Sequence, residues 1–242
     1  MADSPGKVAV VFADGGMGEV GKHVVGVALK QGLTVQAMGM PGSQVTDVAS
    51  VTPVELVRQD LLSQKEVHWA KPMDDTELAA LFEGLQTVIC CVGNRQPGMD
   101  RCAAASMRNI VQACKKSGVA RLVCISSVGI GDSWPPMPWS WVGTIFKVFL
   151  LCCIRSACND LNLMEDAVAH SGLDYLIVRP TGLSPDKQPE GQWKLLKVGD
   201  PPGETVHYEV AKEDVAAFML SEALRPTLHQ TAVTIGSPMQ SS

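Results

Sequence analysis

The sequence predicts an α/β fold: one doubly wound, mostly parallel sheet with helices on both faces. Three observations favour it. Short apolar runs recur as candidate buried strands, segments of helical periodicity separate them, and a glycine-rich turn joins the first strand to the first helix. The chain of 242 residues is long enough for one large domain, and no shift in composition marks a second. We therefore expect a single domain over residues 1–242.

The first expected unit is a strand over 8–13, a glycine turn and a helix. Gly15, Gly18 and Gly21 have G-x-x-G-x-x-G spacing. In such a turn the first glycine permits a tight bend, the second lets a pyrophosphate approach the backbone, and the third lets the helix pack on the strand. The amides at the helix start can then bind an anion. An ordinary strand-to-helix turn is the alternative, but apolar residues at helical spacing and a second strand over 33–38 favour a dinucleotide-binding βαβ unit.

The rest of the chain continues the alternation of helices and strands. The expected elements, in order, are a helix over 74–83, a strand over 86–92, a helix over 99–117, and strands over 120–126 and 173–178. Glycine and proline interrupt the pattern after residue 39. This interruption predicts an irregular insertion at about 41–70, around one short strand near 54–57.

Composition and charge exclude several classes of function. Lys and Arg number 20 against 25 Asp and Glu, and no basic run is present, so the sequence lacks the features of a nucleic-acid-binding protein. The first residues have no cationic and apolar signal, and with eight cysteines this favours a reducing, cytoplasmic location, or an organelle if a transit peptide is missing from the sequence. We expect four cysteines in the core: Cys90, Cys91, Cys114 and Cys124. No cysteine or histidine spacing predicts a metal site.

The segment 134–154 combines three tryptophans with a nearly continuous apolar run. Lys147 interrupts this run and Arg155 ends it, so it is too short for a membrane span. Two interpretations remain. The first is a buried helix with a proline-rich packing loop; the second is an apolar lid over a flat substrate, or a surface that contacts a membrane or a partner.

Residues 109–127, which end in the strand and the pair Ser126 and Ser127, resemble the atypical short-chain dehydrogenase/reductases. More narrowly, they are similar to the NAD(P)H-binding, NmrA-like branch that includes the flavin reductase/biliverdin reductase B proteins. The similarity continues through 171–183 and 212–216. It implies an NAD(P)-binding Rossmann fold with bound NAD(P)H, where NADP is favoured by family habit. It also implies substrate-side elements at about 132–165 and 183–210, and a small-molecule acceptor.

The resemblance also implies which residues form the site. The coenzyme would contact the first loop, the ends of several strands and the turn after the last of them: Gly15, Met17, Gly18, Glu19, Val20, Met40, Cys91, Val92, Gly93, Ser126, Pro180, Thr181 and Gly182. Ser127 would be the catalytic residue, beside the nicotinamide. The acceptor side would include Trp134, Asp160 and Met164. Taken singly, the serines could be ordinary strand-end hydroxyls and 180–182 an ordinary turn.

Two departures from the family concern the coenzyme phosphates. The family loop reads G-A-T-G-x-x-G, whereas this chain has an additional residue pair before Gly15 and an acidic Glu19 within the loop. Met40 takes the place where NADP-using relatives carry an arginine, and no acidic residue replaces it to bind an NAD ribose. A cation for the 2′-phosphate would have to come from elsewhere in the fold, with Lys22, Arg58 and Lys71 as candidates.

The catalytic tyrosine of many short-chain dehydrogenases is missing. The chain has two tyrosines, and neither follows Ser127 in the helix that would present a Y-x-x-x-K pair. Tyr208 and Lys212 have that spacing, but we expect them to straddle a strand end and the start of a helix at Asp214. These observations favour hydride transfer to a conjugated acceptor such as a flavin or quinone, with a proton from solvent or Ser127. The alternative is a regulator or assembly scaffold that has kept the fold and lost turnover.

Overall fold

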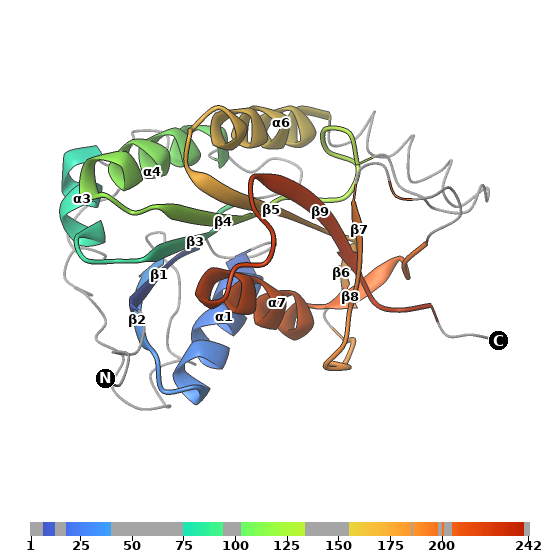
Figure 1. Cartoon of the computed structure of the whole chain (residues 1–242). Helices are drawn as coiled ribbons and strands as arrows, with labels where there is room; N and C mark the ends of the chain where they lie inside the picture. Colours follow the sequence, from blue (N-terminus) through green and yellow to red (C-terminus); the bar gives the residue numbers. More distant parts are fainter. Residues whose placement is uncertain are drawn as a thin grey trace.

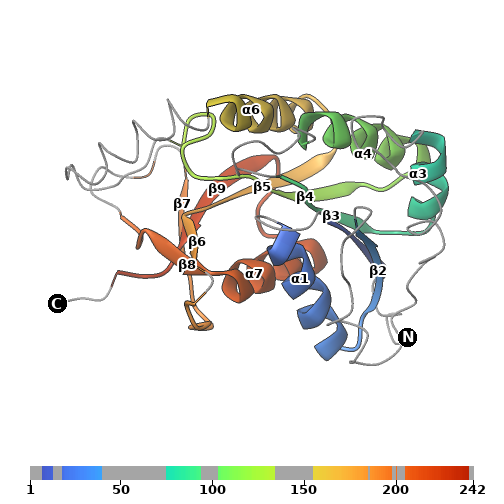
Figure 2. The same cartoon turned by 180° about the vertical axis from the view of Figure 1, so that it is seen from behind.

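A computed structural model of the chain describes residues 7–12, 18–39, 75–93, 103–133, 155–184, 186–197, 200 and 205–239. This part forms three layers, in which a twisted sheet lies between two groups of helices (Figure 1). One group consists of α3 (Asp75–Phe82), α4 (Ala103–Ser117) and α6 (Arg155–Ala169). The other consists of α1 (Gly18–Lys30) and α7 (Lys212–Leu224), and Figure 2 shows the same division from behind.

The main sheet has the strand order β2-β1-β3-β4-β5-β9-β7 within the described residues. Its parallel strands are β1 (Lys7–Phe12), β2 (Thr34–Gly39), β3 (Thr87–Cys91), β4 (Arg121–Ile125), β5 (Asp174–Pro180) and β9 (Thr231–Gly236). The edge strand β7 (Lys194–Lys197) pairs antiparallel with β9. A second, two-stranded sheet pairs β6 (Gly182–Ser184) with β8 (Glu209–Ala211).

Burial on both faces explains why the central strands are apolar except at their first residues, Thr87 and Arg121. Every residue of β3 and β4 is buried, as a parallel sheet covered by helices on each side requires. Cys90 and Cys124 are neighbours in the register of these two strands. With Cys91 and Cys114 they lie in the core, which confirms the prediction for these four cysteines.

Helices α1 and α4 each bury one stripe of side chains against the sheet. In α1 the stripe includes Val20, Val24 and Ala28, and in α4 it includes Met107 and Ile110. Helix α4 has two lysines in its last turn, where the negative end of its dipole favours cations. These helices therefore form where the periodicity of the sequence predicted them.

The chain reverses its direction of travel across the sheet between β1 and β3. Strand β2 lies on one side of β1, and the next described strand, β3, lies on the other. In open α/β sheets the crevice at such a switch point, at the carboxyl ends of the strands, is where ligands bind. The start of α1, at Gly18, follows β1 at this place.

The predicted fold class is confirmed, and the described elements agree with the predicted ones to within a few residues. The sequence did not predict β9, β7 or the small β6-β8 sheet. The expected insertion at 41–70, its strand near 54–57 and the segment 134–154 lie outside the described residues.

Candidate functional site

The start of α1 provides the part of the predicted glycine loop that the structure describes. Gly18 is the first residue of the helix, and both Gly18 and Val20 are buried. Glu19 accepts a hydrogen bond of 3.0 Å from Lys22 Nζ. Four other predicted site residues, Gly15, Met17, Met40 and Trp134, lie outside the described residues. Lys22, one candidate cation for a 2′-phosphate, is thus paired with Glu19, which partly neutralises its charge.

The end of β3 lies at the switch point of the described sheet, and its side chains are uncharged. Cys91, Val92 and Gly93 are all buried. Burial, with a smaller contribution from Cys90, raises the pKa of the Cys91 thiol well above its usual value. Cys91 is therefore a neutral thiol at physiological pH and is unsuited to nucleophilic attack.

Buried hydroxyl groups without a hydrogen-bond partner follow three adjacent strands of the described sheet. They belong to Ser126 after β4, Thr181 after β5 and Ser237 after β9. Backbone hydrogen bonds hold two of these residues beside the neighbouring strand: Ser126 N donates to Val178 O at 2.7 Å, and Thr181 N donates to Ile235 O at 3.0 Å. A buried hydroxyl normally has a partner, so these three groups are candidates for hydrogen bonds to a polar ligand.

The loop 127–133, which follows β4, holds Ser127 at the same edge of the sheet. Ser127 is buried, and its Oγ lies 3.2 Å from the carbonyl oxygen of Val128. The loop folds back on itself: Ile130 N donates to Ser127 O, and Ser133 Oγ donates to Ile130 O at 2.6 Å. Val128 N donates to Pro180 O at 3.0 Å, which brings the loop beside the end of β5. Ser126, Ser127, Pro180 and Thr181 are thus brought together.

A buried ion-pair network underlies this loop. Arg179 of β5 donates to both carboxylate oxygens of Glu165, at 3.1 and 2.7 Å, and to Asp132 at 2.6 Å. Arg179 and Glu165 are both buried, whereas Asp132 is exposed. Burial alone would lower the pKa of Arg179, but the hydrogen bonds and charges of Glu165 and Asp132 outweigh it and raise that pKa. The guanidinium therefore stays charged beneath the site.

Asp160 and Met164 lie on α6, on the face of the sheet that also carries α4. The Asp160 carboxylate accepts hydrogen bonds from the backbone amides of Ala103 and Ala104, at 2.9 and 3.2 Å. Met164 is completely buried in the core. The contacts of Asp160 thus hold the start of α4, a role that the sequence did not indicate.

The segment 205–209 crosses the ends of β5 and β9 and requires glycine beneath it. A Cβ at Gly182 would lie 2.8 Å from the carbonyl oxygen of Tyr208, and one at Gly236 would lie 2.7 Å from Cβ of Val206. Tyr208 is 60% exposed, and its ring stacks on His207 with ring centroids 4.4 Å apart. This aromatic pair lies on the loop before β8, and Lys212 begins α7, so Tyr208 and Lys212 lie on either side of the short strand β8.

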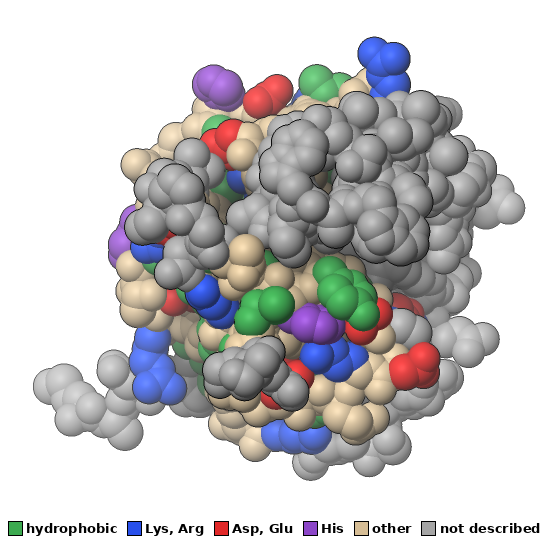
Figure 3. All heavy atoms as spheres, turned by 90° about the vertical axis from the view of Figure 1, so that its right-hand side faces the viewer, with side chains coloured by type: hydrophobic (Ala, Val, Ile, Leu, Met, Phe, Trp, Pro, Cys, Tyr) green, Lys and Arg blue, Asp and Glu red, His purple; other side chains and the backbone are tan. Residues whose placement is uncertain are grey.

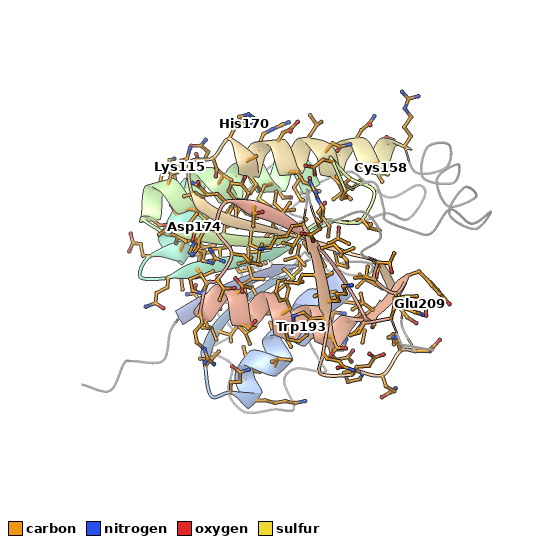
Figure 4. The ribbon with its side chains drawn as sticks, turned by 45° about the vertical axis from the view of Figure 1, so that its right-hand side comes forward. Lys115, Cys158, His170, Asp174, Trp193 and Glu209 are labelled. Carbon is orange, nitrogen blue, oxygen red and sulfur yellow. The ribbon has the colours of Figure 1, made fainter. Side chains whose placement is uncertain are left out.

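The electrostatic character of this face is mixed. Figure 3 views the molecule from the side on which β6, β7 and β8 lie, and its described surface carries hydrophobic, basic, acidic and histidine side chains together. Figure 4 shows Cys158 and Glu209 toward this side, and Lys115 and Asp174 toward the opposite one.

Within the described ranges, no group of three His, Cys, Asp or Glu side chains could hold a metal ion. None of the described helices is long and apolar enough to cross a membrane.

Comparison with known proteins decides the family. A family described as NAD(P)H-binding matches residues 15–226, most of the chain. The chain belongs to this NAD(P)H-binding family. An uncharacterized chloroplastic protein of Arabidopsis thaliana is 27% identical to this family member over 229 residues, which cover 92% of the chain and 74% of the relative. The resemblance noted in the sequence, and the prediction of an NAD(P)H-binding domain, are thereby confirmed.

Solved structures confirm the Rossmann-type fold of this NAD(P)H-binding protein. ChuY, an anaerobilin reductase from Escherichia coli O157:H7, superposes with a TM-score of 0.66 at 23% identity, covering 98% of this chain and 99% of ChuY. A short-chain dehydrogenase/reductase from Veillonella parvula in complex with NADP gives a TM-score of 0.67 at 16% identity, covering 97% and 96%. At these identities the comparison establishes the fold alone.

Two features of the site were not evident from the sequence. The partners of Arg179 are distant from it in the chain, and no local pattern of the sequence suggested them. Asp214 is buried at the start of α7 and accepts hydrogen bonds of 2.9 Å from the amides of Glu190 and Gly191, which fixes the loop before β7. The only hint of Asp214 in the sequence was its place in the segment 212–216, which resembles the family.

Proposed function

We propose that this chain is an NAD(P)H-dependent reductase that transfers a hydride to a flat, conjugated acceptor such as a flavin or quinone. The row of buried, unpartnered hydroxyls at Ser126, Thr181 and Ser237 carries the proposal. These groups follow the carboxyl ends of adjacent strands, beside the switch point where an α/β sheet of this kind binds its coenzyme. When bound, NAD(P)H supplies the hydride for the reduction.

The described residues fit such a coenzyme in three respects. The first turn of α1, from Gly18, offers backbone amides and a helix dipole to a pyrophosphate. Cys91 and Val92 offer an apolar wall to the adenosine side. The hydroxyls of Ser126 and Thr181 have no hydrogen-bond partner in the described structure, so they are available to the carboxamide group of a nicotinamide ring.

The choice of acceptor rests on the positions of the tyrosines and on a protein of the same fold. The two tyrosines of the chain are Tyr175, near the amino end of β5, and Tyr208, on the loop before β8. Neither lies in the helix after Ser127, where a tyrosine-dependent site carries its acid. An acceptor whose own conjugation spreads the incoming charge needs no such acid. Ser127 or solvent can deliver the proton. ChuY, which shares the fold, is an anaerobilin reductase, and this supports a flat conjugated acceptor.

A second candidate is an NAD(P)-sensing regulator or scaffold without turnover. The Glu19–Lys22 pair favours it, because an acidic side chain at the start of α1 weakens the attraction for phosphate. Steady-state consumption of NADPH or NADH with FMN or menadione decides between the two functions. Turnover that requires both substrates supports the reductase, whereas coenzyme binding with no turnover supports the regulator.

Coenzyme binding is tested first, by the fluorescence of NADPH and NADH during titration with the protein. We expect binding that Gly18→Trp abolishes, because the added ring blocks the approach to the helix start. Gly26→Trp is the matched control on the same helix, since an added Cβ there has no atom within 4 Å. No binding of either coenzyme at millimolar concentration, or equal binding by Gly18→Trp, would contradict the proposal.

A further inference from the structure

We propose that Arg179 is a positioning residue, which acts through Asp132 and Glu165 to hold the loop 127–133 and, with it, Ser127. We call the contacts among α6, Arg179 and this loop the α6 bracket. It consists of Asn162 and Glu165 on the helix, Arg179 on β5, and Gly131 and Asp132 in the loop. Only the expected effect on kcat rests on the proposed function. The contacts themselves belong to the described structure.

The α6 bracket fixes the loop at two consecutive residues. Gly131 N donates to Oδ1 of Asn162 at 2.9 Å, and the Asp132 carboxylate accepts from Arg179 Nη1 at 2.6 Å. Arg179 is in turn held by both oxygens of Glu165. A planar guanidinium that binds one carboxylate with two N–H groups and another with a third has little freedom left. The loop is thus joined to a helix and to a strand at once.

Close packing adds a steric constraint at Gly131. Its φ is +60°, and a Cβ there would lie 2.6 Å from Arg179 Nη2 and 3.0 Å from Glu165 Oε2. The backbone therefore lies directly against the buried ion pair, and only glycine allows both the conformation and the approach. Any change in the position of the guanidinium is passed to the loop backbone.

The position of the α6 bracket argues for a functional role. Ser127 begins the same loop, and the Val128 amide donates to the carbonyl of Pro180, the residue after Arg179. A buried ion pair adds little net stability compared with apolar residues of similar size, because its charges lose their hydration. The ion pair orients a polar loop at the carboxyl edge of the sheet, which apolar residues could not do.

A second buried arginine provides a matched control at the opposite ends of the same two strands. Arg121, the first residue of β4, donates to Asp174, the first residue of β5, at 2.5 Å, and to backbone carbonyls of Glu222 and Leu228, each at 3.0 Å. It is as buried as Arg179. Weakening this second network perturbs the fold without touching the loop 127–133.

The experiment compares Arg179→Lys and Asp132→Asn with Arg121→Lys and Asp174→Asn. Amide hydrogen exchange is measured on the folded, coenzyme-free proteins, together with kcat and KM for NADPH and FMN. We expect faster exchange at Gly129, Ile130 and Gly131 in the first two variants alone. A misplacement of about 1 Å at a site can cost on the order of 100-fold in rate. We therefore expect Arg179→Lys to lower kcat by roughly 10- to 100-fold, with KM for NADPH nearly unchanged.

Three results would overturn the positioning role. The first is unchanged exchange in the loop of both bracket variants. The second is a loss of kcat in Arg121→Lys as large as that in Arg179→Lys at equal loss of melting temperature. The third is a rise of KM for NADPH with kcat unchanged. Asp132 is 60% exposed, so Asp132→Asn keeps the test valid if Arg179→Lys fails to fold. Absence of coenzyme binding in the wild type would contradict the proposed function, while the exchange result would still decide the positioning role.

Discussion

Oδ2 of Asp160 on α6 accepts a 2.9 Å hydrogen bond from the backbone amide of Ala103, the first residue of α4. The second carboxylate oxygen accepts from the next amide, that of Ala104. Four amides at a helix start have no partner within the helix, and a carboxylate there also meets the positive end of the dipole. One helix therefore caps its neighbour within the layer that covers one face of the sheet.

Replacement of Asp160 tests this cap. We expect Asp160→Ala to lower the free energy of unfolding by about 1 kcal/mol, within the 0.5–2 range typical of lost N-caps. Asp160→Asn should lose less, because its amide oxygen still accepts one hydrogen bond. Urea denaturation measures both. Equal stability of Asp160→Ala and the wild type would show that the capping interaction contributes nothing in solution.

The close crossing of the segment 205–209 gives a prediction for two glycines. Gly182→Ala and Gly236→Ala each force a methyl group to within 3 Å of backbone or side-chain atoms that are held in place. Such overpacking costs about 1–3 kcal/mol, so both variants should melt at lower temperature than the wild type. Gly26→Ala, in the middle of α1 with open space around it, should instead raise stability by up to about 1 kcal/mol. A neutral effect at 182 and 236 would contradict the described crossing.

Asp174 gives the protein a defined dependence on acid pH. Burial acts to raise the pKa of this carboxyl, but hydrogen bonds from His229 and Arg121, with the charges of both, outweigh it, and the pKa is lowered. A carboxyl with a depressed pKa stabilises the fold above its unfolded pKa, about 3.9, and loses that contribution as pH falls through the folded value.

Denaturation between pH 2 and pH 7 tests this linkage. Wild-type stability should fall as the pH drops below about 4, and Asp174→Asn should remove part of that fall while lowering stability at neutral pH. The comparison isolates Asp174 from the other carboxylates. If the stability difference between the two proteins were the same at all pH values, the carboxyl would have no depressed pKa.

The core cysteines should resist thiol reagents in the folded protein. Burial raises the pKa of Cys114 to about 12 and that of Cys124 well above its usual value, so neither forms the reactive thiolate near pH 8. Peptide mapping after alkylation at pH 8 should find Cys90, Cys91, Cys114 and Cys124 unmodified until denaturant is added. Cys158, which is partly exposed, serves as the positive control. Rapid native labelling of Cys124 would mean that the sheet opens far more readily than its packing suggests.

The sequence predicted most of the parallel sheet because burial on both faces makes its strands continuous apolar runs, as in 86–92 and 120–126. It could not predict β9, where threonines interrupt the apolar residues, or the edge strand β7, where lysines begin and end the strand. Edge strands are partly exposed and short, so their patterns resemble those of loops.

The site was predictable only where it depends on the backbone. Glycine spacing and strand ends are local features, and Gly18 and Ser126 take the places in the fold that the sequence suggested for them. The α6 bracket depends instead on side chains that meet across the fold: Asp132 and Glu165 are separated from Arg179 by 47 and 14 residues. The unpartnered state of Thr181 Oγ1 is likewise a property of packing, which no spacing rule reports.

Coenzyme binding at the carboxyl edge of the sheet is tested most directly by a crystal structure after soaking with NADPH. We expect density at the β1-β3 switch point, with the pyrophosphate at the amide of Gly18 and the nicotinamide end within hydrogen-bond distance of Ser126 or Thr181. Density at another place on the sheet would contradict this binding mode. So would a crevice filled by side chains that leaves those hydroxyls unpartnered at saturating NADPH.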